Sequence, residues 1–494
     1  MAEPAPYSWR PLRPRALSHP GGSVSEALTS EGVGRLARRP GLDSAAGAVT
    51  STGPWPVPRI GVLLAAGRSE RFHPMTGGGS KALVRLGGLP LVERAVRSLL
   101  ALGLEEVVVV LGYHSSPVAA VVSGIAPGRV RAVYAERWEA GNGASLAAAE
   151  ELVADEPLFL LQTTDHVFTE GAQGSLVRAG KPAVLVDLHP AASAWAEGTR
   201  VHLEGTRVLA LGKHLERPAI DCGVFLLPPT VFESQRRAAA EGDFSLARAV
   251  TRLSQTVPVT AIPLPPDCWW QDVDTPDDLR AARVGLRRSL VRGNDGPVSR
   301  YLNRPLSTRL SMALAPLRLS PDLMSFVALL LGLLAAGLLA AGEGVVGGVA
   351  AHAASVVDGV DGEVARLQIR ARPRGAMLDG VLDRLADAAI VAGLGLWALV
   401  GADSPSVVLV LAVAATAGAL LSMATKDRAT ALGLAPAPER GLAFLLGGRD
   451  GRLLLVALGS LAGRPTLTLM AVSATSALSL GLRLLLVGRR PRAV

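Results

Sequence analysis

The chain has 494 residues, of which 49% are hydrophobic. This length predicts at least two domains, and the concentration of apolar residues after Ser320 excludes a wholly soluble protein. The net charge of +8 comes almost entirely from arginine, since the chain has only four lysines. Most arginines lie in loops beside apolar segments, which is typical of membrane orientation, so we expect no nucleic-acid partner.

Residues 1–58 are rich in Pro, Arg, Ser and Gly, lack the apolar core of a signal peptide, and are expected to form a disordered extension. The next segment, 59–284, contains apolar strand-like runs at 60–67, 105–112 and 157–166, with a helical pattern between the first two. Strands alternating with helices predict an α/β domain with a Rossmann-like, mostly parallel sheet. In such sheets ligands bind beyond the carboxyl ends of the strands.

A glycine turn ends the first strand-like run, and two basic residues, Arg71 and Lys81, follow it. Backbone amides of such a turn bind phosphate oxygens, and the two cations would offset the charge of a leaving pyrophosphate. An ordinary strand-to-helix turn is the alternative. The candidate nucleotide-binding residues of this turn are Leu64, Ala65, Ala66 and Gly67.

Three acidic residues of the α/β domain are candidate metal ligands. Asp165 ends the third strand-like run, and Asp272 and Asp274 lie in the acidic segment WWQDVDT. Carboxylate oxygens are the ligands that Mg²⁺ and Mn²⁺ prefer. Lys213, in the segment LGKHL, is a candidate for binding the phosphate of a second substrate, and a solvated surface lysine is the alternative.

The remainder of the chain is predicted to be a membrane protein. Residues 285–320 form a basic, partly amphipathic connector expected to lie along the membrane surface, and 321–494 form an all-α domain with six transmembrane helices. Basic residues gather in alternate loops, which predicts a multi-pass protein of the inner (plasma) membrane with the α/β domain and both termini in the cytoplasm. The six predicted spans are 323–341, 345–365, 376–400, 405–425, 451–463 and 466–487.

Four aspartates lie in the second and third predicted spans. Asp358 and Asp361 are three residues apart, and Asp379 and Asp383 are four apart, so each pair shares one side of a helix. An aspartate near the bilayer centre costs roughly 2.5–3.5 kcal/mol, and a divalent ion bound by all four carboxylates removes that cost. The alternative is that these carboxylates lie at helix ends, solvated or paired with neighbouring arginines.

The segment that contains these aspartates reads D-x-x-D-G-x-x-A-R, then eight residues, then G-x-x-x-D-x-x-x-D. This pattern resembles the CDP-alcohol phosphotransferases at every specified position. The resemblance implies ligands for metal ions and the CDP pyrophosphate at Asp358, Asp361 and Asp379, a general base beside the metal at Asp383, and a cytidine-binding side at Gly362, Ala365 and Arg366.

The α/β domain resembles the sugar-phosphate nucleotidyltransferases. Its segment GNGASL is similar to the base-recognition segment of that family, which implies nucleotide contacts at Gly141, Asn142, Gly143 and Ser145. The sequence departs from the family at Ser69 and Glu70, where glycine followed by serine or threonine is usual.

The two halves together resemble the bifunctional inositol-1-phosphate cytidylyltransferases and di-myo-inositol phosphate phosphate synthases. The segments TTDHVF, DCGVFLL, DVDTPDDLRAA and LNRPLSTRLS also match that family. The resemblance implies that CTP and inositol-1-phosphate give CDP-inositol and pyrophosphate. CDP-inositol and a second inositol-1-phosphate then give the phosphorylated di-inositol phosphodiester and CMP. Mg²⁺ or Mn²⁺ is expected at both sites, and a homodimer through the membrane domain stays open.

The second inositol-1-phosphate needs cations for its phosphate, and the candidates are Arg440, Arg449 and Arg452, with membrane orientation as the competing explanation for their charge. Two other functions stay open. One is a phospholipid synthase that uses CDP-diacylglycerol and has a fused nucleotidyltransferase. The other is a membrane transporter or sensor without enzymatic activity, whose carboxylates bind an ion.

Overall fold

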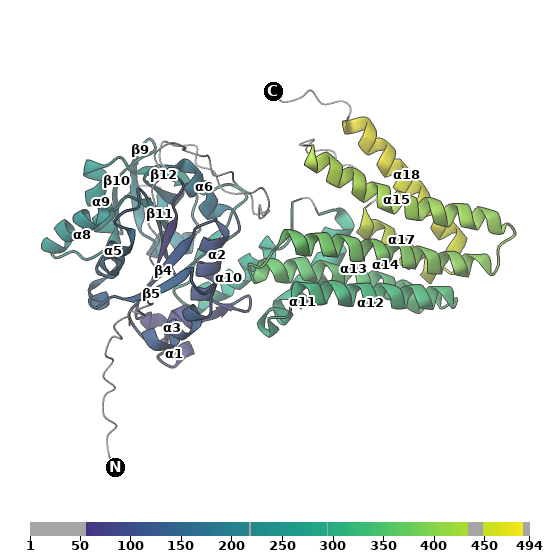
Figure 1. The fold of residues 1–494 in the computed structure, drawn as a ribbon, viewed down its shortest axis with the longest axis horizontal. Coiled ribbons are helices and arrows are strands. Elements are labelled where there is room, and N and C mark those ends of the chain that lie inside the picture. Colours follow the sequence, from purple (N-terminus) through teal and green to yellow (C-terminus); the bar gives the residue numbers. More distant parts are fainter. Residues whose placement is uncertain (1–55, 217–218, 294, 433–447, 488–494) are drawn as a thin grey trace, which may run out of the picture. The chain divides into compact units, whose positions relative to one another are not determined.

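The computed structural model describes residues 56–216, 219–293, 295–432 and 448–487. Nearly all of the predicted disordered extension, residues 1–55, lies outside the described residues. An α/β part runs from Ile60 to Ser289, and an all-helical part runs from Arg304 to Val487 (Figure 1).

The α/β part contains a nine-stranded sheet in the order β5-β4-β1-β6-β11-β8-β12-β10-β9. Two short pairs, β2 with β3 and β7 with β13, lie outside it. The strands are β1 Ile60–Ala65, β2 Arg85–Leu86, β3 Leu89–Pro90, β4 Glu106–Leu111, β5 Val130–Tyr134, β6 Phe159–Thr163, β7 His166–Phe168, β8 Ala183–Asp187, β9 Arg200–Glu204, β10 Arg207–Gly212, β11 Ala219–Leu227, β12 Thr260–Pro263 and β13 Trp270–Asp272.

The prediction of a mostly parallel sheet is correct for seven of its nine strands, and β10 and β11 run in the opposite direction. Strands β5, β4, β1 and β6 are parallel neighbours. Strand β11, however, runs antiparallel to both β6 and β8, and β10 runs antiparallel to β9 and β12. Only two residues connect β9 to β10, and so short a turn joins only antiparallel strands.

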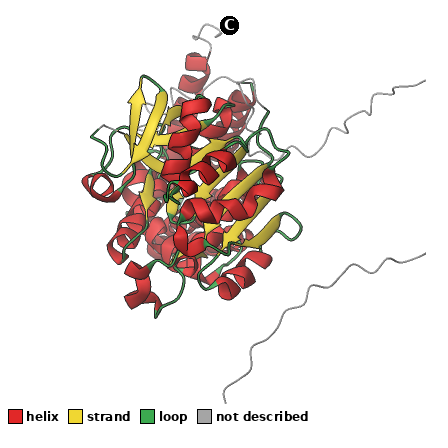
Figure 2. Cartoon of the chain, turned by 90° about the vertical axis from the view of Figure 1, so that its left-hand side faces the viewer, coloured by secondary structure: helices red, strands yellow, loops and turns green. Residues whose placement is uncertain are grey.

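Two buried apolar clusters cover the two surfaces of the sheet. Along β1, Val62 and Leu64 belong to one cluster and Leu63 and Ala65 to the other, as the alternation of side chains in a strand requires. Figure 2 shows helices lying against the strands. The helices are α1 His73–Thr76, α2 Leu91–Ala101, α3 Ser115–Ser123, α4 Asn142–Leu146, α5 Glu150–Val153, α6 Ala172–Ala179, α7 Ala192–Glu197, α8 Val231–Ala240, α9 Leu246–Thr256 and α10 Pro276–Ser289.

Two local features place side chains at the edge of the sheet. Gly223 of β11 has a φ of +72°, and a Cβ there would lie 2.7 Å from the His166 ring, so only glycine leaves room for that histidine. Helix α10 begins after a capping box of Thr275 and Asp278, with Pro276 in its first turn. This cap ends the acidic segment. The pairing of β13 with β7 holds that segment beside β7.

The all-helical part contains one helix at each predicted span. Helix α11, Arg304–Leu314, precedes them and packs against α13. The agreement with the predicted bounds is within a few residues at most ends. The six helices are α12 Pro321–Ala340, α13 Gly344–Leu367, α14 Pro373–Leu399, α15 Pro405–Ala431, α17 Arg449–Leu461 and α18 Pro465–Val487.

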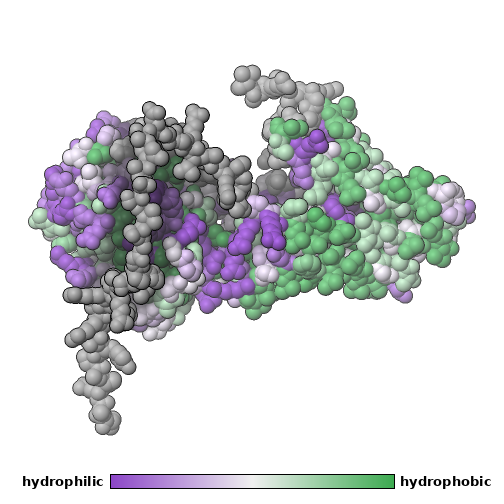
Figure 3. Space-filling model, viewed as in Figure 1, coloured by the Kyte–Doolittle hydropathy of each residue, from purple (hydrophilic) through white to green (hydrophobic). Residues whose placement is uncertain are grey.

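Of the described helices, three are long and apolar enough to cross a membrane by length and composition: Pro321–Ala340, Pro405–Ala429 and Pro465–Leu485. The other three do not qualify as continuous apolar spans, because α17 has only 13 residues and α13 and α14 contain the aspartates and several arginines. Large apolar side chains such as Leu330, Val413 and Leu485 are exposed on these helices, and Figure 3 shows hydrophobic residues covering much of their surface. This surface indicates contact with lipid.

Candidate active sites

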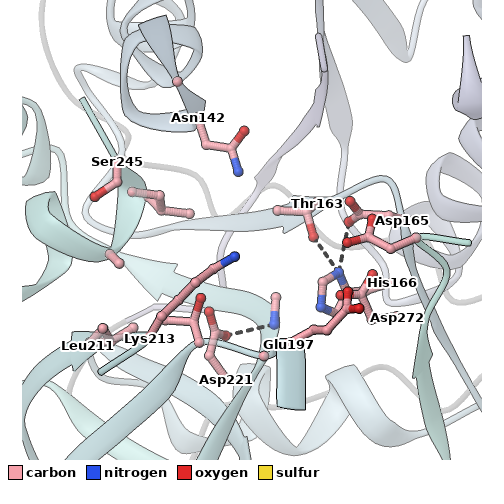
Figure 4. Close-up of a pocket in the computed structure, with 18 of the residues that line it drawn as sticks. Asn142, Thr163, Asp165, His166, Glu197, Leu211, Lys213, Asp221, Ser245 and Asp272 are labelled. Carbon is pink, nitrogen blue, oxygen red and sulfur yellow. Dashed lines mark hydrogen bonds and ion pairs between the residues drawn. The ribbon is translucent and has the colours of Figure 1, made fainter. Parts of the chain in front are cut away.

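A cavity of about 1220 Å³ lies in the α/β part, where the carboxyl end of β6 meets β11 and the end of β10. Figure 4 shows Asn142 and Lys213 pointing into it, beside a group formed by Asp165, His166 and Asp272. The cavity therefore brings together two predicted base-recognition residues, Gly141 and Asn142, the predicted phosphate-binding lysine and all three predicted metal ligands of this part.

The acidic group is assembled by the pairing of β7 with β13, which places Asp272 opposite His166. One ligand atom from each of Asp165, His166 and Asp272 lies within 4.8 Å of the other two. The ring Nδ1 of His166 lies 2.8 Å from Oδ1 of Asp165 and 2.7 Å from the hydroxyl of Thr163. Among the described residues, the buried Oδ1 of Asp272 has no hydrogen-bond partner. Two carboxylates, one of which has a buried oxygen without a partner, and an imidazole together fit a divalent cation.

The charges of this group depend on one another. Burial raises the pKa of Asp272 to about 7, since the charged form loses its hydration and repels Asp165 and Asp274. Burial would lower the pKa of His166, but the carboxylates of Asp272 and Asp165 outweigh it and raise that pKa to about 9. Burial likewise disfavours charged Asp165, but Lys81 and His166 hold its pKa well below the ordinary value. Asp165 is therefore ionised at neutral pH, whereas Asp272 titrates close to neutral pH.

Lys81 lies among these acids although only 7% of its surface is exposed. Its Nζ is 2.5 Å from Oδ1 of Asp274 and 3.1 Å from Oδ2 of Asp165. Burial opposes the charge of Lys81, but these two carboxylates raise its pKa above the ordinary value. Asp274 also pairs with Arg71, at 3.0 Å, and Arg71 contacts Glu197. Asp274 thus binds two cations and lies outside the group of three that fits a metal.

The predicted nucleotide-binding residues divide into two sets. Gly141 and Asn142 line the cavity, whereas Gly143 and Ser145 are buried in helix α4, where Gly143 N donates to the Phe244 carbonyl. The segment Leu64, Ala65, Ala66 and Gly67 is not among the cavity-lining residues. Ser69, the departure from the family pattern, has a φ of +55°, a left-handed conformation in which glycine costs least.

The all-helical part brings Asp358, Asp379 and Asp383 together, with one carboxylate oxygen of each within 4.8 Å of the others. Among the described residues, the buried oxygens Oδ1 of Asp358 and Oδ1 of Asp379 have no hydrogen-bond partner. Asp361 lies beside them and accepts a 2.5 Å hydrogen bond from Ser325. A cluster of carboxylates with free buried oxygens fits a divalent cation, and Asp361, also predicted as a ligand, is not part of the group of three.

The predicted cytidine side follows on helix α13, with Ala365 buried and Gly362 and Arg366 half-buried. Among the predicted phosphate-binding arginines, Arg449 contacts Asp358, and its Nη2 lies 3.2 Å from Oδ1 of Asp383. Arg452 lies 3.4 Å from Asp387. The third candidate, Arg440, lies outside the described residues.

A second polar group anchors α11 to the aspartate-bearing helix α13. Glu363 is 0% exposed and accepts hydrogen bonds from Arg304 at 2.6 Å, Ser307 at 2.7 Å and Ser311 at 2.6 Å. A buried carboxylate needs such compensation. The connector is therefore fixed to the helix that holds Asp358 and Asp361.

Family models match both parts of the chain. The model for the MobA-like NTP transferase domain matches residues 61–256, and that for CDP-alcohol phosphatidyltransferases matches residues 318–478. A "Bifunctional IPC transferase and DIPP synthase" of Rubrobacter xylanophilus is 39% identical over 422 residues, which cover 83% of this chain and 92% of the relative.

The chain belongs to the family of bifunctional IPC transferases and DIPP synthases. A member from Thermococcus kodakarensis is 34% identical over 340 residues, covering 68% of this chain and 75% of the relative. A solved structure, the inositol-1-phosphate CTP transferase from T. maritima, is 22% identical, with a TM-score of 0.41, and covers 47% of this chain and 96% of that one. The family membership predicted from the motifs is confirmed, and so is an enzyme that combines nucleotidyltransferase and CDP-alcohol phosphotransferase domains.

Several residues of the two sites and their surroundings were not predicted from the sequence. His166 directly follows Asp165, a predicted metal ligand, and this adjacency could have marked His166 as a further ligand. Asp387 lies four residues after Asp383 and continues the same helix side, which was also a usable signal. Glu197 and Glu363 gave none, because their partners are distant in the chain. Asp221 gave none either, since its contact with Gly223 is local and only the fold brings it to the cavity.

Proposed function

We propose that the chain makes a phosphorylated di-inositol phosphodiester in two consecutive steps. The observation that supports this most directly is the presence of two acidic, metal-compatible sites on one chain, one in a nucleotidyltransferase part and one in a CDP-alcohol phosphotransferase part. In the first step a phosphate oxygen of inositol-1-phosphate attacks the α-phosphorus of CTP. The bond to the β,γ-diphosphate breaks, and CDP-inositol and pyrophosphate form.

In this first site Asp165, His166 and Asp272 would hold Mg²⁺ or Mn²⁺, which offsets the negative charge of the triphosphate oxygens. Lys81 pairs with Asp165 and Asp274 and holds both carboxylates in place. Asn142 binds the cytosine ring, and Lys213 binds the phosphate of inositol-1-phosphate as it enters the cavity. Arg71 lies next to Asp274 and receives the departing pyrophosphate.

In the second step a hydroxyl of another inositol-1-phosphate attacks the phosphorus that bears the inositol of CDP-inositol. Asp383 accepts the hydroxyl proton as the new P–O bond forms, and CMP leaves with the bonding electrons of the broken P–O bond. Asp358, Asp361 and Asp379 would hold divalent ions at the pyrophosphate, where they stabilise the charge on CMP. Arg449 and Arg452 bind the phosphate of the incoming inositol-1-phosphate.

Six helices are proposed to span the inner membrane with both termini in the cytoplasm: α12, α13, α14, α15, α17 and α18. Three of them have the required length and apolar character. The basic residues beside α13 and α14 support a cytoplasmic location for the connection between these helices. This topology places the second site at the cytoplasmic side, where CDP-inositol is made.

Phosphorus NMR of membranes supplied with CTP, Mg²⁺ and inositol-1-phosphate tests both steps. Asp165→Ala should stop CDP-inositol formation and be rescued by added CDP-inositol, whereas Asp383→Asn should let CDP-inositol accumulate. The exposed residues Asp155 and Asp403 provide controls as Asp155→Ala and Asp403→Asn, which should behave as wild type. Phosphodiester made by both active-site variants, or a wild type that uses only CDP-diacylglycerol, would show that the proposal is wrong.

A further inference from the structure

One carboxylate of the helical part organises three arginines, and none of the proposed chemical steps uses it. Asp387 lies on α14, four residues after Asp383, and is 5% exposed. Its Oδ1 accepts a hydrogen bond of 3.0 Å from Nε of Arg449. Its Oδ2 lies 3.2 Å from Nη1 of Arg384 and 3.4 Å from Nη2 of Arg452.

These three guanidinium groups come from two helices that meet at Asp387. Arg384 lies on α14, and Arg449 and Arg452 lie in the first turn of α17. Among the described residues, Asp387 is the one carboxylate that contacts all three guanidinium groups, whereas Asp358 and Asp383, which are among the carboxylates proposed to act on the donor and the acceptor hydroxyl, contact only Arg449 and Arg384. A phosphate monoester is a dianion near neutral pH, and guanidinium groups bind its oxygens through paired N–H donors. The group thus presents several guanidinium N–H donors of the type that binds a phosphate monoester.

The same group is continuous with the site of proton removal. Nη2 of Arg449 lies 3.2 Å from Oδ1 of Asp383, and Nη2 of Arg384 lies 3.8 Å from Oδ2 of Asp383. A phosphate bound by these arginines therefore places the rest of its molecule beside the proposed base. Cations this close to one another repel, so a fixed anion is needed to hold them in one arrangement before the substrate arrives.

We infer that Asp387 is a positioning residue that holds Arg384, Arg449 and Arg452 as a binding group for the phosphate of the acceptor alcohol. This inference rests on the two-step function proposed above and adds Arg384 to its phosphate-binding residues. Without the Asp387 charge the three guanidinium groups separate, and Arg449 turns further toward Asp358 and Asp383. The acceptor phosphate then binds more weakly, while the CDP end of the donor keeps its own ligands.

The test uses purified full-length protein in lipid nanodiscs, supplied with CDP-inositol and a range of inositol-1-phosphate concentrations. Asp387→Asn keeps the shape of the side chain and removes its charge. We expect the KM for inositol-1-phosphate to rise about tenfold, equivalent to about 1.4 kcal/mol, and the KM for CDP-inositol to change less than about twofold. The preference for inositol-1-phosphate over unphosphorylated inositol as acceptor should fall by a similar factor. Inorganic phosphate should inhibit the variant less than the wild type.

Asp387→Glu restores the charge and should recover most of the acceptor affinity. Arg384→Gln removes one of the three cations and should reproduce the selective rise in the KM for inositol-1-phosphate. It keeps the inference testable if Asp387→Asn does not fold. Asp403→Asn, an exposed carboxylate change, is the control. An equal rise of both KM values, or an unchanged acceptor preference in folded Asp387→Asn or Arg384→Gln, overturns the inference. A wild type that makes no phosphodiester from CDP-inositol and inositol-1-phosphate overturns the proposed function instead.

Discussion

Nη2 of Arg449 lies 3.2 Å from Oδ1 of Asp383. The first is the proposed ligand of the acceptor phosphate, and the second is the proposed base for the acceptor hydroxyl. Because these side chains are in contact, one connected group of residues would bind the phosphate of the acceptor and remove the proton from its hydroxyl. It also means that Arg449 offsets the negative charge of the aspartate cluster, since it reaches Asp358 as well.

Arg449→Gln should therefore stop the second step and spare the first. We expect the rate of phosphodiester formation from CDP-inositol to fall by about 100-fold, since a charged donor beside the reacting groups is lost. Phosphorus NMR should show CDP-inositol accumulating from CTP and inositol-1-phosphate. Arg464→Gln, a change at an exposed arginine, is the matched control. Phosphodiester formation at the wild-type rate in Arg449→Gln would refute this role.

Lys81→Met should destabilise the α/β part and inactivate the first step. Removing a nearly buried cation leaves Asp165 with His166 and Asp274 with Arg71 as their remaining partners, which costs about 1–3 kcal/mol. Adding Asp274→Asn should recover part of this loss without restoring CDP-inositol synthesis, because one of the two carboxylates that contacted Lys81 is then neutral. Thermal unfolding and CDP-inositol assays measure both effects. The exposed Lys181→Met is the control, and a double variant no more stable than Lys81→Met would contradict the pairing.

Asp221→Asn should stabilise the α/β part at neutral pH. Burial raises the pKa of Asp221 to about 6 from an ordinary 3.8. Between these values the folded protein binds a proton that the unfolded chain lacks, so the contribution of Asp221 to stability is present below about pH 4 and lost as the pH rises through 6. A shift of this size corresponds to about 3 kcal/mol.

Asparagine is neutral throughout and can still accept the 2.7 Å hydrogen bond from Gly223 N. The melting temperature of Asp221→Asn relative to wild type should therefore increase between pH 4 and pH 6 and stay constant above it. Thermal melts at several pH values measure this difference. A difference that is the same at pH 4.5 and pH 7.5 would show that Asp221 carries no such penalty.

Glu363→Gln should loosen α11 from α13. The variant leaves Arg304 with only Asp295 as an anionic partner and replaces an acceptor of three hydrogen bonds by a group with one acceptor oxygen. We expect a loss of about 2–4 kcal/mol of stability, measured by thermal shift in detergent. Glu343→Gln, at an exposed glutamate just before the same helix, should have little effect. Equal melting temperatures for the two variants would count against the anchoring role.

Much of the helical part was predictable, because its signals lie within short stretches of sequence. The spacing of Asp358, Asp361, Asp379 and Asp383 places them on two helix sides without knowledge of any other residue. Helix positions also followed from local hydropathy. The number of membrane spans was less secure, since α13 and α14 contain the functional charges, and these lower their apolar character.

The α/β part was predicted less completely. The three predicted strands correspond to β1, β4 and β6, and Asp165 follows the end of β6, because runs of apolar residues mark buried strands. The direction of β11 was not predictable from such runs, because a buried strand has the same composition whether it runs parallel or antiparallel to its neighbours. The pairing of Asp274 with Lys81 likewise depends on how two segments 193 residues apart meet.

The contact between Arg449 and Asp383 illustrates what the sequence determined and what only the tertiary structure decided. The sequence alone determined the type of chemistry, since fixed spacings of carboxylates on helices, and their order along the chain, identify two transferase domains. The tertiary structure decided which cations meet those carboxylates. Arg449 begins α17, 66 residues after Asp383, and Asp387 holds it together with Arg384 and Arg452. Such contacts arise from helix packing across long separations in sequence, and no local periodicity encodes them.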